Sequence, residues 1–300
     1  MSRSALQEET MAHYLYAEGS AKDIQAAAKH LEVIFEEDGF AISNFEIDED
    51  NGIWALSLYP SEEAIKDAHK KALSELAGLN IALPLAVEDL GDVDWVSKSL
   101  EGLVPVEAGR FIIHGSHDKG MDTHGRIPVQ INAGQAFGTG HHGTTAGCLK
   151  VLSDELRRTH PLRILDLGTG SAVLAIGLAK MLKQEIVATD IDPVSIETAK
   201  DNIRINEVHP FVTTAVAAGF SHPVFKEKGP FDLIVANILA GPLCKMAPDL
   251  ANNLALGGRV ILSGLLPHQR ARVLAAYRLQ GFRHIRTVKE DGWLVLVLER

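Results

Sequence analysis

The order of apolar and polar positions divides the chain into two differently patterned parts. Over residues 11–90 it predicts strand, helix, strand, strand, helix and strand. The first helix should begin after Ser20, whose side chain can cap free backbone N–H groups. The second should begin at Pro60, with the carboxylates of Glu62 and Glu63 in its first turn. This βαββαβ order is typical of a small α+β ferredoxin-like domain, with two helices on one face of an antiparallel sheet.

From residue 163 onward, short apolar runs alternate with helical stretches. Five runs are bounded by turn residues, as expected for buried parallel strands, and two more at the end should pair antiparallel. The predicted strands are 163–167, 185–190, 211–216, 231–237, 259–263, 282–288 and 293–298. Asp192 before Pro193 predicts a helix start, and Gly257 with Gly258 predicts a helix end. The pattern predicts an α/β, Rossmann-like domain with a seven-stranded, mostly parallel sheet.

Between these parts, the apolar positions of residues 91–127 follow neither the helical nor the strand period, and the stretch contains several glycines. Such a stretch predicts a linker followed by an irregular lid or edge strand. We therefore expect a ferredoxin-like domain over residues 1–90, a linker and lid region over 91–127, and the α/β domain over 128–300.

The composition fits a globular protein with a packed core, since 46% of the residues are hydrophobic and 23% are charged. No apolar run reaches the length of a membrane span and residues 1–10 are polar and acidic, so we expect a cytoplasmic protein. Cys148 and Cys244 form neither a disulfide framework nor a zinc-ligand spacing. The formal net charge of -10 opposes non-specific binding to nucleic acid and favours a basic partner.

A group of histidines raises the question of a metal site. Its members are His114, His117, His124, His141 and His142. No HExxH motif and no pair at i, i+4 helical spacing accompanies them, so we expect solvated loop histidines to account for most of the group, and no metal.

The residues with the clearest chemistry lie where strands of the α/β domain end. Residues 164–172, ILDLGTGSA, read as a buried strand that leads into a glycine turn and then a helix. Gly168 and Gly170 allow backbone angles and a close cofactor approach that a side chain would block. Asp190 ends the next strand, where a carboxylate can accept both ribose hydroxyls of an adenosine. This arrangement predicts a nucleotide-type cofactor site.

An NAD site has the same geometry and is the rival interpretation. It fits less well, because Val173 stands where the GxGxxG motif needs a small residue. A pyrophosphate also gives no reason for a carboxylate, Asp166, just ahead of the turn. The ammonium group of a methionine would suit a site near Asp166, which favours S-adenosyl-L-methionine.

Two further segments point to group transfer. Asn237 follows the fourth strand at the edge where open α/β sheets bind their ligands. Its amide oxygen can accept a hydrogen bond from an amine and so orient the nitrogen lone pair toward a methyl group. The glycine-rich run 137–145 precedes a helix predicted over 146–156, and its backbone amides and threonine hydroxyls suit the polar end of a cofactor.

Three segments, GTGHH-x-TT, LDLGTGS and NILAGPL, occur in the order typical of the ribosomal protein L-eleven (L11) methyltransferase family, PrmA, which the chain resembles over residues 134–281. Residues 92–95, DVDW, are similar to the DW linker signature of that family. The chain departs from the family at Ala172, which replaces a third glycine, and at Gly143, which replaces Glu or Pro. Together with the residues named above, the resemblance implies cofactor contacts at Thr145, Asp166, Gly168, Gly170, Asp190 and Asn237.

The resemblance also implies the reaction. It is N-methylation of lysine side chains and of the N-terminal amine of L11, with S-adenosyl-L-methionine as the methyl donor. Residues 1–90 would then recognise the substrate and residues 128–300 would catalyse. Asn237 would be the catalytic residue that orients the neutral amine, while solvent takes the proton. We expect a monomer, since a recognition domain on a mobile linker needs room to move.

Two other classes of protein stay open. A methyltransferase of the same fold that acts on another protein, a nucleic-acid base or a small molecule is the nearer one, although Ile238, Leu239 and Ala240 supply no aromatic ring to stack a base. The other is a non-catalytic ribosome-assembly protein that retains a cofactor fold. Asp190 and Asn237 argue against it.

Overall fold

The computed structural model describes residues 13–35, 38, 40–48, 52–61, 63–79, 81–89, 105–132 and 143–300. The chain divides into two compact units, Met1–Val93 and Asp94–Arg300. The DVDW segment, the positions 137–142 of the glycine-rich run and the histidines at 141 and 142 lie outside the described residues.

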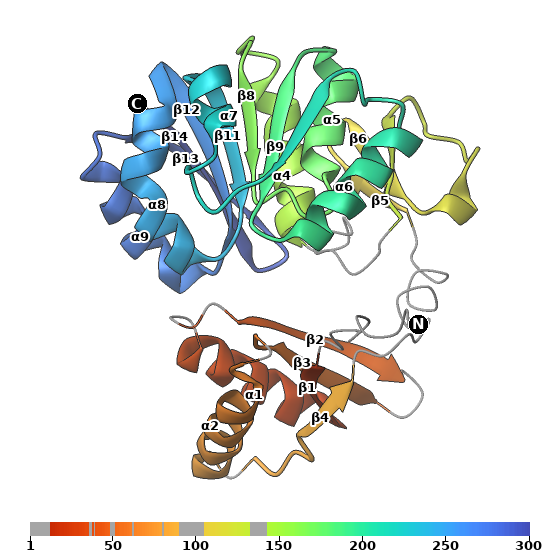
Figure 1. The fold of residues 1–300 in the computed structure, drawn as a ribbon. Helices are drawn as coiled ribbons and strands as arrows, with labels where there is room; N and C mark the ends of the chain where they lie inside the picture. The colour runs from red at the N-terminus through yellow and green to blue at the C-terminus, as the bar shows by residue number, and fades with distance from the viewer. Residues whose placement is uncertain are drawn as a thin grey trace, which may run out of the picture. The chain divides into compact units, whose positions relative to one another are not determined.

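The first unit is a four-stranded antiparallel sheet with two helices on one face (Figure 1). Its elements are β1 (His13–Ser20), α1 (Ala21–Ile34), β2 (Ala41–Asp48), β3 (Ile53–Tyr59), α2 (Ile65–Gly78) and β4 (Ala86–Asp89). The strand order β2-β3-β1-β4 places β3 between the two strands that α1 connects. This is the ferredoxin-like arrangement, so the predicted βαββαβ fold is confirmed.

Local signals explain one helix start of this unit and fail at the other. The Ser20 hydroxyl caps α1 by accepting the N–H of Asp23 at 3.2 Å, as the sequence predicts. The second helix begins at Ile65 and not at Pro60, so that prediction is wrong. The reason is a turn ahead of the helix, in which the Ser61 carbonyl accepts the N–H of Ala64 at 2.9 Å.

The second unit contains a small three-stranded sheet with the order β5-β6-β7. Its strands are β5 (Val106–Ala108), β6 (Phe111–His114) and β7 (Ile127–Gln130). Of the two structures predicted for this stretch, an irregular lid or an edge strand, these residues form strands. All four residues of β6 are buried, so the strand has no alternation of apolar and polar positions that a sequence pattern could reveal.

The main sheet of the second unit has seven strands in the order β10-β9-β8-β11-β12-β14-β13. β14 pairs antiparallel with both β12 and β13, and the other neighbouring strands of this sheet pair in parallel. Its elements are α4 (Gly143–Glu155), β8 (Ile164–Leu167), α5 (Val173–Leu182), β9 (Ile186–Asp190), α6 (Pro193–Ile205), β10 (Val212–Val216), α7 (Pro223–Lys228), β11 (Phe231–Asn237), α8 (Ala240–Asn253), β12 (Leu254–Leu265), α9 (Arg270–Arg278), β13 (Arg283–Glu290) and β14 (Trp293–Glu299). The predicted Rossmann-like, mostly parallel sheet is confirmed.

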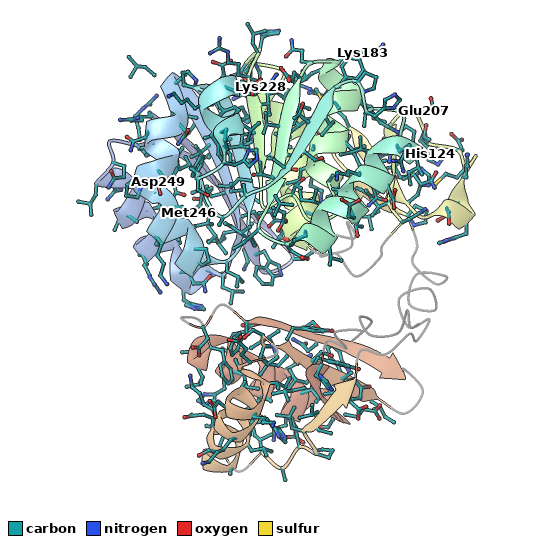
Figure 2. The ribbon with its side chains drawn as sticks, in the orientation of Figure 1. His124, Lys183, Glu207, Lys228, Met246 and Asp249 are labelled. Atoms are coloured by element: carbon teal, nitrogen blue, oxygen red, sulfur yellow. The ribbon has the colours of Figure 1, made fainter. Side chains whose placement is uncertain are left out.

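Helices cover both faces of this sheet (Figure 1). One core joins the sheet to α4, α5 and α6, and the other joins it to α7, α8 and α9. The strand order reverses between β8 and β11, and ligands of such sheets bind beside the carboxyl ends of the strands at that reversal. Lys183, just after α5, and Lys228, at the end of α7, lie at the opposite edge (Figure 2).

Two predicted boundaries in the second unit have different outcomes. Asp192 caps α6 as expected, since its carboxylate accepts the N–H groups of Val194 at 2.9 Å and Ser195 at 3.1 Å. The glycine pair at 257 and 258 does not end a helix, because α8 ends at Asn253 and the pair lies inside β12. Among the described residues, no helix has the length and apolar character that a membrane crossing requires.

Candidate functional site

A tight turn between β8 and α5 forms the cradle predicted from the sequence. Gly168, Gly170 and Ala172 all have left-handed backbone, with φ of 72°, 53° and 64°. The Thr189 carbonyl at the end of β9 accepts the N–H groups of Gly168 at 2.8 Å and Thr169 at 2.9 Å. A Cβ atom at Gly168 would collide with the side chain of Ile238, so only glycine fits this position.

Asp190 holds this turn from the neighbouring strand β9. Its Oδ2 atom accepts the Gly170 N–H at 2.8 Å, and its Oδ1 atom accepts the Asp192 N–H at 3.1 Å. The two backbone groups fix the carboxylate at the carboxyl edge of the sheet. A carboxylate oxygen can accept more than one hydrogen bond, so both oxygens can also accept ribose hydroxyls.

Asp166 lies beneath the turn and is completely buried. Its Oδ2 atom accepts the Thr169 hydroxyl at 2.7 Å and the Ala175 N–H at 3.1 Å, whereas Oδ1 has no hydrogen-bond partner among the residues described. Burial raises the pKa of this carboxyl to about 6, the two hydrogen bonds act against the shift, and the charge of Asp190 adds to it. An isolated acceptor of this kind is suited to a cationic group of a ligand.

Asn237 ends β11 and contacts the first turn of α4. Its Nδ2 atom lies 3.2 Å from the Thr144 hydroxyl and 3.4 Å from the Thr145 hydroxyl, and both threonines are buried. Within the described part of the chain, the Asn237 Oδ1 atom has no hydrogen-bond partner although it is buried. The threonines therefore fix the amide plane and leave its acceptor oxygen for another group.

The start of α4 is held in place by the turn between β13 and β14. A Cβ atom at Gly143 would lie 2.8 Å from Cβ of Asp291, and one at Gly147 would lie 2.8 Å from a methyl group of Val295. The Lys150 ammonium also pairs with Glu290 at 2.5 Å. The small residues on this helix face allow the close approach that brings the threonines to Asn237.

The structure thus brings together several of the residues selected from the sequence. Thr145 contacts Asn237, and Gly170 contacts Asp190. The sequence indicated Thr144 only as a member of the glycine-rich run 137–145, and it did not predict a contact of Ile238 with the cradle. The paired threonines in GTT were the available signal for Thr144, whereas the contact between Ile238 and Gly168 joins two different strand ends and leaves no local pattern.

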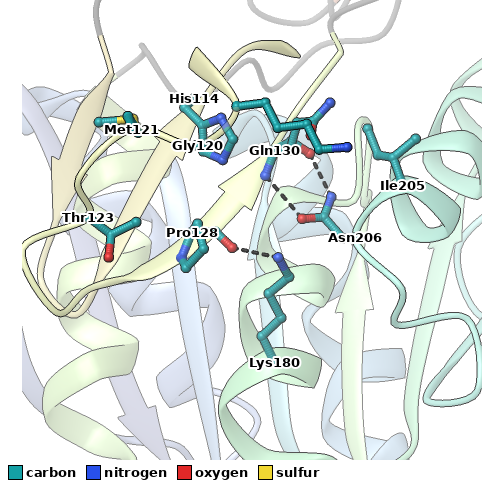
Figure 3. Close-up of a pocket in the computed structure, with 10 residues that line it drawn as sticks. His114, Gly120, Met121, Thr123, Pro128, Gln130, Lys180, Ile205 and Asn206 are labelled. Atoms are coloured by element: carbon teal, nitrogen blue, oxygen red, sulfur yellow. Dashed lines mark hydrogen bonds between the residues drawn. The ribbon is translucent and has the colours of Figure 1, made fainter. Parts of the chain in front are cut away.

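A cavity of about 250 Å³ lies elsewhere in the second unit, between the small sheet and the helices α5 and α6 (Figure 3). It is lined in part by His114 and Lys180, and by none of the predicted cofactor contacts. His114 is only 7% exposed and its Nδ1 atom donates to the Gly115 carbonyl at 2.8 Å, so it is an exception to the solvated loop histidines expected for most of this group. Within the described residues, no group of His, Cys, Asp and Glu side chains is placed to hold a metal ion.

The sheet order with one antiparallel strand, together with the glycine turn at its carboxyl edge, defines a class I methyltransferase fold. The model of the family described as "Ribosomal protein L11 methyltransferase (PrmA)" matches residues 1–300. The chain belongs to this family, which confirms the resemblance found in its motifs.

Individual relatives agree with this membership. A ribosomal protein L11 methyltransferase of Mesorhizobium japonicum is 48% identical over 97% of this chain and 99% of its own length. One of Rhizobium meliloti is 50% identical over 95% of this chain and 98% of its own length. The crystal structure of a ribosomal protein L11 methylase of Lactobacillus delbrueckii subsp. bulgaricus superposes with a TM-score of 0.59 at 28% identity, over 66% of this chain and 99% of that one.

Proposed function

We propose that this chain is an S-adenosyl-L-methionine-dependent N-methyltransferase whose substrate is ribosomal protein L11. Membership of the family and the names of its relatives support the reaction and the substrate. In the structure, the proposal rests above all on the Asn237 amide, which is fixed by two buried threonines and whose acceptor oxygen has no partner among the described residues. That oxygen suits an amine that must present its lone pair in one direction.

The residues of the cradle fit the proposed cofactor. When bound, S-adenosyl-L-methionine supplies a methyl group on a positively charged sulfur. Asp190 would accept the ribose hydroxyls, and the Oδ1 atom of Asp166, which has no partner in the described part of the chain, would bind the ammonium of the methionine portion. The left-handed turn from Gly168 to Gly170 has no side chains at the two glycines, so the ligand can closely approach the protein backbone there.

Asn237 acts on the acceptor amine. A lysine ammonium must lose its proton before its nitrogen can attack, and we assign that proton to solvent. The Asn237 oxygen then accepts an N–H of the neutral amine and aims its lone pair. We propose that lysine side chains and the N-terminal amine of L11 are both substrates. The contribution of the chain is mainly positioning, for which no metal is required.

We propose that the first unit recognises L11. The sheet face opposite its helices carries tyrosines and carboxylates: Tyr14 stacks on Tyr59 with ring centroids 5.5 Å apart, and the Tyr16 hydroxyl donates to Glu18 at 2.8 Å. Aromatic rings and carboxylates together suit a partner rich in lysine and arginine, as does the net charge of -10. We further propose a monomer that acts in the cytoplasm without direct contact to nucleic acid.

The test is mass spectrometry of purified L11 incubated with the full-length protein and S-adenosyl-L-methionine. We expect mass gains in whole methyl groups, and their loss with Asp190→Ala. Asn237→Ala should lower kcat by about a hundredfold, because the amine is no longer oriented. Asn253→Ala is the matched control, since that amide only donates to the Asp249 carbonyl at the far end of α8.

Each outcome separates two interpretations. An unmodified L11 alongside clear cofactor binding would reject the substrate and leave an enzyme for another protein, a nucleic acid or a small molecule. Absence of cofactor binding would revive a non-catalytic ribosome-assembly role. Full activity of Asn237→Ala would contradict the catalytic assignment of that residue alone.

A further inference from the structure

Two buried asparagines lie one turn apart, Asn202 in α6 and Asn206 directly after it, and their side chains hold different backbone groups of the second unit. The Asn206 amide pairs with β7, accepting the Gln130 N–H at 3.0 Å and donating to the Gln130 carbonyl at 2.6 Å (Figure 3). The Asn202 side chain is 1% exposed and its Nδ2 atom donates to the Ser171 carbonyl, inside the cradle, at 3.0 Å. Its Oδ1 atom accepts the Asn132 N–H at 3.0 Å.

The Ser171 carbonyl precedes a residue with costly backbone geometry. Ala172 is fully buried and has φ of 64°. Left-handed backbone costs a residue with a Cβ atom about 1–2 kcal/mol, so it persists only where its surroundings hold it. Here the peptide between the two residues is held at both ends, by Asn202 at its carbonyl and by the Thr169 carbonyl, which accepts the Ala172 N–H at 2.9 Å.

We propose that Asn202 is a positioning residue of the cofactor cradle. By holding the Ser171 carbonyl it keeps Ala172 left-handed, and thereby keeps the whole turn from Gly168 onward in the shape that receives the cofactor. The identity of that cofactor rests on the proposed function. The Asn206 side chain contacts Gln130 of β7 and, at 2.8 Å, the Asn202 carbonyl, and among the described residues it has no contact with the cradle.

The test measures the affinity of the full-length protein for S-adenosylhomocysteine by isothermal titration calorimetry. Asn202→Ala should raise Kd about five- to tenfold, as expected for the loss of one hydrogen bond that fixes the site. Asn206→Ala is the matched control: it should lower Tm to a similar extent and change Kd less than about twofold. Equal weakening of affinity by both variants would overturn the proposal, because it would mean a general effect of α6.

A second substitution separates positioning from stability. Glycine adopts φ of 64° without strain, so Ala172→Gly should recover most of the affinity that Asn202→Ala loses, although it cannot restore the missing hydrogen bond. No recovery in the double variant would show that Asn202 does not act through Ala172. If Asn202→Ala cannot be purified, Asn202→Ser, which also reaches neither partner, takes its place.

Hydrogen exchange of the ligand-free protein tests the inference independently of the proposed function. Asn202→Ala should speed amide exchange in residues 168–172, whereas Asn206→Ala should speed it at β7 and leave the turn unchanged. A turn that stays equally protected in Asn202→Ala would overturn the inference even if the enzyme methylates L11. A wild-type protein that does not bind S-adenosylhomocysteine would reject the proposed function but not this coupling.

Discussion

At the scale of single residues, Asp166 combines an unsatisfied carboxylate with complete burial. Burial raises its pKa to about 6, so the folded protein keeps a proton on this group where the unfolded chain has already lost it. Between about pH 4 and pH 6 the folded state therefore binds more protons, and the free energy of unfolding falls as the pH rises through that window. The total effect is at most about 3 kcal/mol.

Asp166→Asn removes this titration and should change the pH dependence of stability. We expect the free energy of unfolding of the ligand-free variant, minus that of the wild type, to increase as the pH rises from 4.5 to 7.5. The reason is that the wild type must ionise a buried carboxyl over this range and the variant does not. Urea denaturation at both pH values measures the difference. If the difference in free energy of unfolding between variant and wild type does not depend on pH, the raised pKa of Asp166 is refuted. The same variant should also bind S-adenosylhomocysteine more weakly, because the carboxylate partner of the ligand ammonium is lost.

Residues at strand ends could be found from the sequence, and their distant partners could not. Asp166, Gly168 and Asp190 stand at places that a local pattern of apolar run, glycine and acid defines. Asn202 carries no such mark. Its partners lie 31 and 70 positions away, so its role depends on how α6 packs against the cradle.

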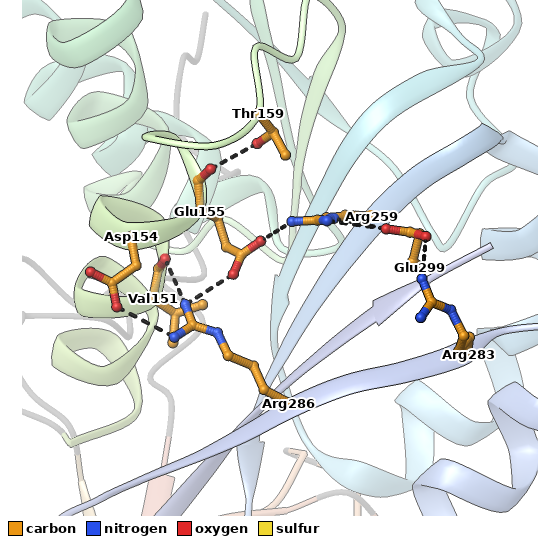
Figure 4. Close-up of polar contacts among 8 residues, drawn as sticks. All are labelled: Val151, Asp154, Glu155, Thr159, Arg259, Arg283, Arg286 and Glu299. Atoms are coloured by element: carbon orange, nitrogen blue, oxygen red, sulfur yellow. Dashed lines mark hydrogen bonds and ion pairs between the residues drawn. The ribbon is translucent and has the colours of Figure 1, made fainter.

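At the scale of elements, the carboxyl end of α4 is fixed by ion pairs to two strands (Figure 4). Glu155 is 3% exposed and pairs with Arg259 of β12 and, at 3.0 Å, with Arg286 of β13. Arg259 also pairs with Glu299 at 3.1 Å, and Glu299 with Arg283 at 2.8 Å. Arg286 also pairs with Asp154 at 3.3 Å, so each of the two arginines has one more exposed carboxylate besides the buried Glu155.

Glu155→Gln should therefore lower the free energy of unfolding by about 1–3 kcal/mol, because each guanidinium group then keeps only its more exposed carboxylate, Glu299 for Arg259 and Asp154 for Arg286. Arg283→Gln is the control: its side chain is 72% exposed, and the loss of its pair with Glu299 should change stability by less than about 1 kcal/mol. Chemical denaturation of both variants gives the comparison. Equal effects would mean that Glu155 contributes no more than a surface ion pair.

Elements differ in how far the sequence determines them. The strands of the main sheet were predicted because each is a short apolar run between turn residues, and β11 has the predicted bounds of 231–237. β6 was missed because its four residues stand between Gly109 and Gly115, in a stretch without a regular period. Gly257 and Gly258 look like a helix end, yet they lie in β12, where the Gly257 N–H donates to the Arg300 carbonyl at 2.6 Å. Tertiary pairing decides such positions.

At the scale of the whole molecule, the two units have separate interiors. Among the described residues, the core of the first unit is built from positions 15–85, and the two cores of the second unit from positions 108–298. No cluster of buried side chains in that part of the chain draws on both units. Each unit therefore has the means to unfold as its own cooperative transition.

Differential scanning calorimetry should accordingly resolve two unfolding transitions. S-adenosylhomocysteine, the product formed from the cofactor, should stabilise only that of the second unit. S-adenosylhomocysteine at a hundred times its Kd adds about 2.7 kcal/mol to the unit that binds it, which raises the Tm of a domain of this size by about 5–10 °C. The proposed contacts all lie in the second unit, so its transition should move while the other stays. Asp190→Ala should abolish the shift without moving the first transition. If S-adenosylhomocysteine moved both transitions of the wild type together, the two units would unfold as one. The inference that separate interiors make the units thermodynamically independent would then be wrong.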